Sequence, residues 1–410
     1  MTSPAAQQRR RLLVISQVYV PDPAAVGQHL ADVAESMAAA GWDVHVYTSS
    51  RGYDDPAMQY PWRELRNGVS VNRFPLSSFG KRSIAVRLLA QFSFLVQATA
   101  RAVFARRFDA LLVSTSPPFA GFFGALLSLI RGTPFLWWVM DINPDQMVIS
   151  GKLSQTSLFV RAFDWMNRVT LRRATAVVTL DDYMAETLYH KVDGREKTHV
   201  IPPWSHNTPH GGTAGDANPF RMAHGLQGRF IVMYAGNHAL QHPLDTLLDA
   251  AKELEHDKHL VFVFVGGGAG KAAVEERIRN GAKNIVSLPY QPLEMLDECL
   301  AAADVHVVSM GNDMVGIVHP CKIYGAMAAA RPVLAFSPHR SHIGSLLATP
   351  GIGWQIDHDS VSTAVAILRA ALASPRGELD AMGDDAAERA ARLFAPQRLI
   401  ARFCSLLSTV

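Results

Sequence analysis

The chain has 410 residues, of which 49% are hydrophobic and 18% charged, and its formal net charge is +3. This composition excludes an intrinsically disordered chain, and the length predicts two domains rather than a single core. A net charge so close to zero gives no indication of nucleic-acid binding. The three cysteines, Cys299, Cys321 and Cys404, lie far apart, so we expect neither a disulfide framework nor a zinc site, and we favour a reducing, cytoplasmic location.

The first half of the chain alternates between predicted strands and helices. The apolar run at 12–15 predicts a buried strand, and we find neither a signal peptide nor a stretch that would span a membrane. A helix is expected from 27 to 40, where Gly41 ends it. Further strands are expected at 44–47, 110–113, 135–139 and 176–179. Alternation of this kind predicts a parallel sheet that is covered on both faces.

The composition changes near residue 204. Residues 205–219 are rich in Gly, Pro, Thr, Asn and His, which predicts a linker. The alternation then begins again, with strands expected at 230–234, 261–265, 285–288, 305–308 and 333–335 and a helix at 244–254. We therefore predict an α/β protein with two doubly wound, Rossmann-like domains, 1–204 and 220–393. The last segment, 394–410, is amphipathic and either closes the second domain or crosses back to the first.

Two glycine turns follow predicted strands of the second domain. Gly266 and Gly267 come directly after one strand, and Gly236, Asn237 and His238 come after the strand before it. Glycine lets backbone N–H groups approach an anion at a helix N-terminus, and Asn or His can donate to a phosphate or a sugar hydroxyl. A tight turn or a helix cap explains these residues about as well.

The segment 314–333 predicts a loop, a helix that begins near Pro320, and a strand after Pro332. Lys322 lies in the first turn of that helix, where a cation is unfavourable for the helix dipole. Phosphate binding therefore explains Lys322 better than a purely structural role does.

A second candidate lies just beyond the predicted strand at 135–139. Asp141 stands just after this strand, where ligands of open parallel sheets bind, and a helix or turn cap is its alternative role. We interpret Asn143 as a helix or turn cap and leave Asp145 open between the two roles.

In this order, these segments resemble family 4 of the retaining glycosyltransferases, whose fold is called GT-B. The resemblance rests on the loop 21–27, the junction 198–204, the two glycine turns, the segment 287–292 and the segment 316–332. The last of these is similar to the branch that assembles O-antigen, capsule and exopolysaccharide. The resemblance implies two Rossmann-like domains that face each other across a cleft, the first binding the acceptor and the second the donor.

The resemblance also implies the reaction. A sugar would pass, with retention of its anomeric configuration, from a nucleotide-sugar, more plausibly a UDP-sugar, to a lipid-linked glycan or polysaccharide acceptor. No metal or other cofactor is expected. The implied catalytic residue is Asp141, and the implied donor-binding residues are Gly27, Gly236, Asn237, His238, Gly266, Gly267, Tyr290, Gly316, Ile317, Val318, His319 and Lys322.

The sequence departs from the family pattern at two places. Ile317 and Gly325 stand where the family often has two glutamates, and the Arg and Lys that commonly follow the first glycine turn are absent from 237–242. These departures leave open a non-catalytic homologue that acts as a scaffold or an activating subunit. A nucleotide-sugar epimerase is a further alternative, but it would need carboxylates that the donor region lacks.

The first domain contains a stretch that is depleted in acidic residues. Between Glu64 and Asp141 the only acidic residue is Asp109. The basic residues there are Arg66, Arg73, Lys81, Arg82, Arg87, Arg101, Arg106, Arg107 and Arg131. Apolar residues between Ile84 and Phe104 recur at near-helical spacing, so the region 66–107 predicts contact with an anionic membrane surface, on the inner face of the plasma membrane. An ordinary domain helix with solvated charges is the alternative.

Overall fold

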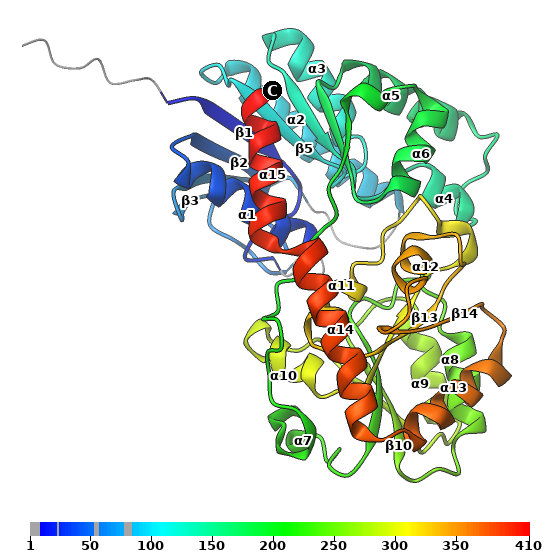
Figure 1. Ribbon diagram of the computed structural model, residues 1–410. Coiled ribbons are helices and arrows are strands. Elements are labelled where there is room, and N and C mark those ends of the chain that lie inside the picture. The colour runs from blue at the N-terminus through cyan, green and yellow to red at the C-terminus, as the bar shows by residue number, and fades with distance from the viewer. Residues whose placement is uncertain (1–8, 23, 53–56, 78–83) are drawn as a thin grey trace, which may run out of the picture. The chain divides into compact units, whose positions relative to one another are not determined.

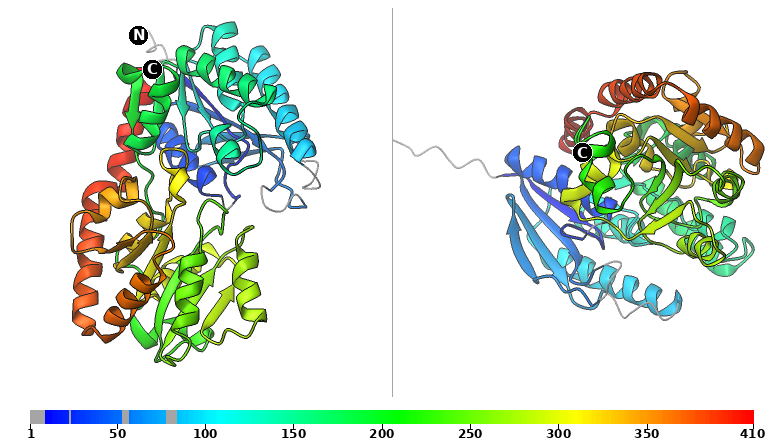
Figure 2. Two further views of the ribbon diagram at one scale, coloured as in Figure 1. Left: turned by 90° about the vertical axis from the view of Figure 1, so that its right-hand side faces the viewer. Right: turned by 90° about the horizontal axis from the view of Figure 1, so that it is seen from below.

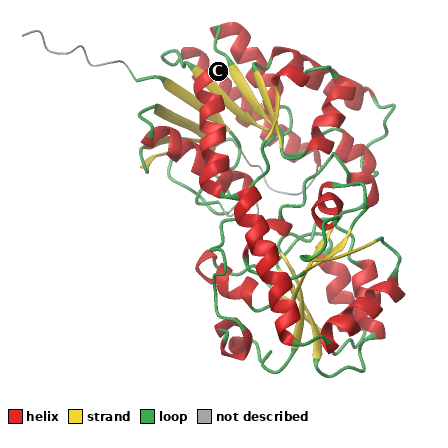
Figure 3. Cartoon of the chain, in the orientation of Figure 1, coloured by secondary structure: helices red, strands yellow, loops and turns green. Residues whose placement is uncertain are grey.

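The computed structural model describes residues 9–22, 24–52, 57–77 and 84–410, and the chain divides into two compact units. Unit 1 comprises Met1–Pro202 and Gln397–Val410, and unit 2 comprises Pro203–Pro396. In each unit, helices lie on both faces of a central sheet (Figures 2 and 3). Lys81, Arg82 and Pro23, which belong to the basic stretch and the first loop considered above, lie outside the described residues.

Unit 1 contains an eight-stranded sheet in the order β3-β4-β2-β1-β5-β6-β7-β8 (Figure 1). Its strands are β1 (Arg11–Ile15), β2 (Asp43–Ser49), β3 (Arg63–Arg66), β4 (Val69–Phe74), β5 (Ala110–Ser114), β6 (Phe135–Trp138), β7 (Ala176–Thr179) and β8 (Thr198–Val200). All neighbouring strands are parallel except β3, which pairs antiparallel with β4. The inner strands are continuous apolar runs because helices bury both of their faces.

The helices of unit 1 are α1 (Ala25–Ala39), α2 (Ile84–Phe104), α3 (Ala120–Arg131), α4 (Asp145–Ile149), α5 (Leu158–Arg173), α6 (Asp182–Lys191), the 3₁₀ turn η1 (Arg195–Lys197) and α15 (Pro396–Thr409). The C-terminal helix α15 belongs to this unit. Its Phe403 packs against Trp138 of β6 with ring centroids 4.3 Å apart, and the Arg10 side chain donates a 2.7 Å hydrogen bond to the Ser408 carbonyl. Aromatic packing thus fixes α15 to the sheet.

Unit 2 contains a six-stranded parallel sheet in the order β11-β10-β9-β12-β13-β14. Its strands are β9 (Phe230–Ala235), β10 (Leu260–Val265), β11 (Ile285–Leu288), β12 (Val305–Ser309), β13 (Val333–Phe336) and β14 (Gly353–Ile356). Its helices are α7 (Pro219–Ala223), α8 (Asp245–Glu253), α9 (Lys271–Arg279), α10 (Leu296–Ala301), α11 (Lys322–Ala328), α12 (His342–Leu347), α13 (Val361–Ala373) and α14 (Arg376–Phe394). The 3₁₀ turns are η2 (Gly215–Ala217), η3 (Leu293–Met295) and η4 (Asn312–Met314).

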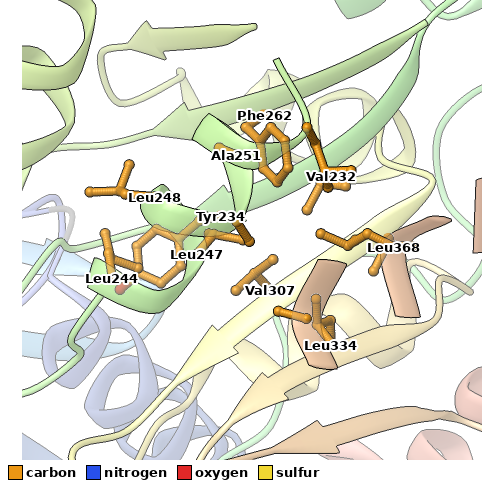
Figure 4. Close-up of a cluster of buried hydrophobic side chains, with 14 of the residues drawn as sticks. Val232, Tyr234, Leu244, Leu247, Leu248, Ala251, Phe262, Val307, Leu334 and Leu368 are labelled. Carbon is orange, nitrogen blue, oxygen red and sulfur yellow. The ribbon is translucent and has the colours of Figure 1, made fainter. Parts of the chain in front are cut away.

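The largest buried cluster of unit 2 lies between the sheet and helices α8 and α13. Leu247 of α8, Leu368 of α13 and Val307 of β12 are among its members (Figure 4). Tyr234 near the end of β9 also belongs to it, and its hydroxyl donates a 3.0 Å hydrogen bond to the Asn237 carbonyl. The core therefore extends directly to the loop that follows β9.

The predicted strands are confirmed to within one or two residues at their ends, whereas β3, β4, β8 and β14 were not predicted. The expected linker is not a free connection, because its residues bond to unit 2: the Thr208 N–H donates to the Asp297 carboxylate at 2.9 Å. All three cysteines are free. Among the described residues, no helix is both long and apolar enough to cross a membrane.

One part of the basic stretch is not on the surface. Arg73 is buried in unit 1, and its guanidinium forms a 2.7 Å ion pair with Glu64. The expectation that Arg73 contributes to a membrane-facing surface is therefore wrong, because its charge is already neutralised inside the unit. The remaining exposed basic residues lie mainly on and after α2.

Candidate functional site

The sheet of unit 2 changes direction at β9. The chain proceeds from β9 to β10 and β11 on one side, then returns to the other side of β9 with β12, β13 and β14. Loops that leave β9 and β12 therefore diverge at the carboxyl ends of these strands, which is where open parallel sheets bind ligands. Most of the donor-binding residues predicted from the sequence lie around this point.

The loops after β9 and β10 interlock through their backbones. The His238 N–H donates to the Gly267 carbonyl and the Gly270 N–H to the His238 carbonyl, each at 2.7 Å. Gly266 and Gly268 have positive φ, and a Cβ on Gly266 would lie 2.1 Å from the Gly236 carbonyl oxygen. Only glycine fits there, so the two predicted turns form one rigid structure. The Gly267 and Gly268 N–H groups make no hydrogen bond among the described residues, and they remain available for an anion.

Lys322, the first residue of α11, lies beside this structure. Its Nζ is 5.1 Å from the centroid of the Tyr234 ring, and a Cβ on Gly236 would lie 3.0 Å from its Cε. Burial lowers the pKa of Lys322 to about 8. No carboxylate among the described residues pairs with it. A half-buried cation without a counter-ion is costly, and a bound anion would remove that cost.

Two histidines near Lys322 are held in the neutral form. His238 is fully buried, and burial, with a smaller contribution from the Lys322 charge, lowers its pKa to about 4. Its ring packs against Tyr234 with centroids 4.9 Å apart, so the side chain shapes the loop, and its contact with a donor stays a prediction. His242 was not predicted from the sequence. Its Nδ1 lies 2.7 Å from the Ser309 carbonyl, and burial lowers its pKa to about 3.

The second lysine near the site, Lys271, already donates hydrogen bonds to backbone carbonyls. Lys271 Nζ donates to the carbonyls of Gly266 and Leu288 at 2.6 and 2.7 Å, so this cation holds the ends of β10 and β11 together. Tyr290 follows β11, is 54% exposed, and lies against Gly267. Asn237 is also exposed. An exposed aromatic ring beside free backbone N–H groups suits a ligand that carries both a base and phosphates.

Buried side chains hold the loop before α11 in place. Ile317 and Val318 are buried, and Gly316 adopts a positive φ of 70°. His319 Nε2 lies 2.6 Å from the Tyr324 hydroxyl, which also lies 2.9 Å from His342 Nε2. The side chains of 317–319 therefore anchor the loop, and its contribution to a ligand would come from the backbone.

Gly27 and Asp141 belong to unit 1, at the carboxyl ends of its strands. A Cβ on Gly27 would lie 3.0 Å from the Tyr19 Cα, so glycine allows the first turn of α1 to pack on the preceding loop. The Asp141 N–H donates to the Thr115 hydroxyl at 3.3 Å, and the carboxylate is half-buried. These two residues therefore belong to a different unit from the other predicted site residues, and their roles stay predictions.

The two polar neighbours of Asp141 have structural environments. The predicted cap role of Asn143 is wrong, because Pro144 occupies the N-cap of α4 and no side chain caps that helix. Asp145 forms a 2.9 Å ion pair with Lys191, which favours a structural role for it. Among the described residues, no group of three or more metal-ligating side chains lies within one unit.

Two family models match the chain. Residues 24–204 match the glycosyl transferase 4-like domain, and residues 229–371 match glycosyl transferases group 1. The chain is a family 4 glycosyltransferase with the GT-B fold. It is 27% identical over 384 residues to the putative colanic acid biosynthesis glycosyl transferase WcaI of Escherichia coli (strain K12), a match that covers 89% of this chain and 93% of that protein.

A second curated relative and a solved structure agree with this assignment. The probable glycosyltransferase WbjE of Pseudomonas aeruginosa is 26% identical over 287 residues, covering 69% of this chain and 70% of that protein. The crystal structure of Anabaena Alr3699/HepE in complex with UDP-glucose has the same fold, with a TM-score of 0.72 at 16% identity, covering 98% of this chain and 100% of that one. The predicted family and the predicted fold are thus confirmed, the family by the domain models and the curated relatives and the fold by the solved structure.

Proposed function

We propose that this glycosyltransferase takes a sugar from a UDP-sugar, with retention of configuration, and adds it to a membrane-associated lipid-linked glycan during polysaccharide assembly. The observation that carries the donor assignment is Lys322, a half-buried lysine without a carboxylate partner among the described residues, beside the carboxyl end of β9. The names of WcaI and of HepE with UDP-glucose support the polysaccharide and UDP-sugar parts of the proposal.

The diphosphate binds beside Gly236 and Gly267 in this proposal. Lys322 supplies a positive charge, and the N–H groups of Gly267 and Gly268 donate to phosphate oxygens. Tyr290, exposed at the end of β11, stacks on the uracil ring. The departing UDP gains negative charge in the transition state, and these preorganised donors stabilise it without a metal ion.

The acceptor binds to unit 1. Retention through an oxocarbenium-like transition state favours a carboxylate near the sugar, and we assign this role to Asp141. The positions of Ile317 and Gly325 supply no carboxylate, so contacts to the sugar hydroxyls come from other groups, of which exposed Asn237 is the best placed within unit 2. A chain that binds the donor but turns nothing over would instead fit the scaffold alternative.

The membrane contact is made by α2 and α3. The outward face of α2 exposes Leu89, Phe92 and Val96, and α3 exposes Leu129 and Ile130. The Phe92 ring packs on Phe123 of α3 at 5.6 Å, so the two helices present one apolar surface. Neither helix contains an acidic residue. An apolar helix face bordered by arginines is typical of proteins that lie on anionic membranes.

The deciding experiment is a calorimetric titration of the purified protein with UDP, GDP, ADP and their common sugars. We expect UDP to bind selectively and one UDP-sugar to bind more tightly than UDP. Lys322→Ala should weaken the binding of UDP and of its sugars strongly, because the lysine is assigned to the diphosphate, with Lys252→Ala, a change on α8, as the matched control. Equal binding of all three nucleotides would contradict the UDP assignment.

A further inference from the structure

The described part of unit 1 contains a groove of about 810 Å³ between the C-terminal half of α2 and the sheet. Helix α2 packs on β2 and β4, and the edge strand β3 extends the sheet beyond the helix. The groove lies towards the amino ends of β1 and β2, whereas Gly27 and Asp141 lie at the carboxyl ends of the strands. It is therefore separate from the residues assigned to the transfer reaction.

The floor of the groove is polar because of the sheet register. His45 of β2 is aligned with Ser70 of β4, which is aligned with Leu65 of β3. The next row on the same face consists of Tyr47, Asn72 and Arg63. Side chains two residues apart on a strand share a face, so these rows bring hydroxyl, amide and imidazole groups together. The Ser70 hydroxyl and the Asn72 amide can donate to phosphate and glycerol oxygens, whereas His45 Nε2 already lies 3.1 Å from the Asp43 carboxylate.

The walls of the groove are positively charged. Arg63, Arg101 and Arg106 are exposed, and no carboxylate among the described residues pairs with them. Among the described residues that line the groove, Glu64 alone is acidic, and it is neutralised by Arg73 at 2.7 Å. The neighbouring Asp43 is neutralised by Arg11 at 2.8 Å. A concave surface with several unpaired arginines and hydrogen-bonding groups attracts a phosphate anion.

The rim of the groove is apolar. Phe104 of α2 is 90% exposed and Leu65 of β3 is 75% exposed. Phe104 follows Leu89, Phe92 and Val96 on the outward side of α2, so the apolar surface proposed to face the membrane runs to the edge of the groove. A free phosphate would gain nothing from these apolar side chains, but an acyl chain next to a phosphate headgroup would.

We propose that this groove binds the phosphate headgroup of an anionic membrane lipid. Arg101, Arg106 and Arg63 contact the phosphate, the Ser70 hydroxyl and the Asn72 amide contact the headgroup oxygens, and Phe104 contacts the acyl chains. The choice of a lipid as the source of the phosphate rests on the membrane contact proposed above. It adds a lipid-selective site to a surface that would otherwise attract any anionic membrane.

The test is a calorimetric titration of the full chain with dihexanoyl phosphatidylglycerol below its micelle concentration. Dihexanoyl phosphatidylcholine and inorganic phosphate are the comparison ligands. We expect the anionic lipid to bind at least tenfold more tightly than either. Equal binding of the two lipids would overturn the proposal, and so would equally tight binding of inorganic phosphate, which would mark a free-anion site.

Two variants locate the site. Arg101→Gln with Arg106→Gln should weaken binding of the short-chain anionic lipid at least tenfold, and Ser70→Leu, which fills the floor, should do the same. The control Arg161→Gln with Arg172→Gln removes two exposed arginines of α5 and should change binding less than twofold. An equal loss in the control would show diffuse attraction and overturn the groove assignment. Thermal unfolding of each variant, compared with that of the wild type, reports whether unit 1 still folds.

The membrane contact can fail separately. Phe92→Ser with Val96→Ser makes the apolar face of α2 more polar and should reduce vesicle binding roughly tenfold or more while leaving the short-chain lipid titration unchanged. Loss of both would place the lipid on the helix face and contradict the groove. If the wild-type protein bound the short-chain lipid but did not bind vesicles, the membrane contact would be contradicted and the groove would not.

Discussion

The Lys322 side chain lies against Gly236, so closely that a Cβ on residue 236 would be 3.0 Å from Lys322 Cε. Gly236 also has a φ of 120°, which L-residues rarely adopt. The glycine therefore has two roles: it permits the turn after β9, and it leaves room for the one cation that we assign to the donor diphosphate.

Gly236→Ala should weaken UDP binding and destabilise the protein together. The strained backbone costs about 1 to 3 kcal/mol, and the new methyl group displaces the lysine. Gly228→Ala is the matched control, because Gly228 also has a positive φ but a Cβ there meets nothing within 4 Å. Calorimetry should show weaker UDP binding only for Gly236→Ala. An equal loss in the control would mean that backbone strain alone explains the effect.

Lys322→Met should weaken UDP binding while stabilising the unliganded protein. Losing a charge-assisted hydrogen bond costs about 1.5 to 3 kcal/mol of binding, or roughly 10- to 150-fold. The free energy of unfolding should rise because methionine carries no charge, whereas lysine places a partly buried charge there without a partner. We expect a gain of about 1 to 2 kcal/mol at pH 7. Thermal unfolding without ligand measures it, and a lower melting temperature for Lys322→Met would contradict the assignment of an unpaired charge.

The same lysine predicts how stability changes with pH. Its pKa is lowered from 10.5 to about 8 in the folded protein, so between these values the folded state binds fewer protons than the unfolded state. The lysine therefore makes folding less favourable below pH 8, and this penalty decreases as pH rises towards 10.5. The difference in melting temperature between Lys322→Met and wild type should shrink across that window. A constant difference would show that the lysine is not desolvated.

UDP affinity should depend on pH in the opposite way. If only the protonated lysine holds the diphosphate, the dissociation constant should rise by roughly tenfold for each unit above the pKa of about 8. Lys322→Arg keeps its charge over this range, so its affinity, though reduced, should stay constant between pH 7 and 10. A wild-type affinity that is flat in pH would show that Lys322 does not contact the phosphates.

The strands in the middle of both sheets could be predicted because parallel strands buried on both faces are continuous apolar runs. The β3–β4 hairpin is different, because β3 is an edge strand and is not a continuous apolar run. Three of the four residues of β3 are charged. The sequence does contain a signal for it, the dipeptide Asn67-Gly68, which is typical of two-residue hairpin turns. In the structure both residues have the positive φ that such a turn requires. A prediction from the charges of this region alone does not use that dipeptide and so misses the hairpin.

The site could be predicted in part. Lys322 was identified from its unfavourable place at a helix start, and the glycine turns from their place after strands. The roles of Lys271 and His242 could not be predicted, because their partners are the carbonyls of Gly266, Leu288 and Ser309. Strand pairing brings those carbonyls into reach, and a sequence does not show the pairing.

Asp141→Ala should lower kcat by at least 100-fold and leave UDP affinity within about threefold, because the carboxylate is assigned to the reacting sugar rather than to the nucleotide. Asp145→Ala is the control: it breaks the ion pair with Lys191 and should reduce stability more than turnover. Rates are measured with the UDP-sugar that calorimetry selects. Normal turnover by Asp141→Ala would return that residue to a structural role. Wild-type turnover that EDTA abolishes would contradict the proposed metal-free stabilisation of UDP.

Phe92→Ser with Val96→Ser should reduce binding to vesicles that contain phosphatidylglycerol by roughly tenfold or more, since both side chains lie on the exposed face of α2 and lose apolar contact with the lipid. Arg101→Gln, Arg106→Gln and Arg107→Gln together should weaken the same binding and its dependence on salt, because each arginine near an anionic surface contributes about 1 kcal/mol. Met222→Ser with Leu293→Ser, which changes two exposed apolar residues of unit 2, is the control. Vesicle flotation measures all three, and binding that persists in the α2 variant but fails in the control would move the membrane contact to unit 2.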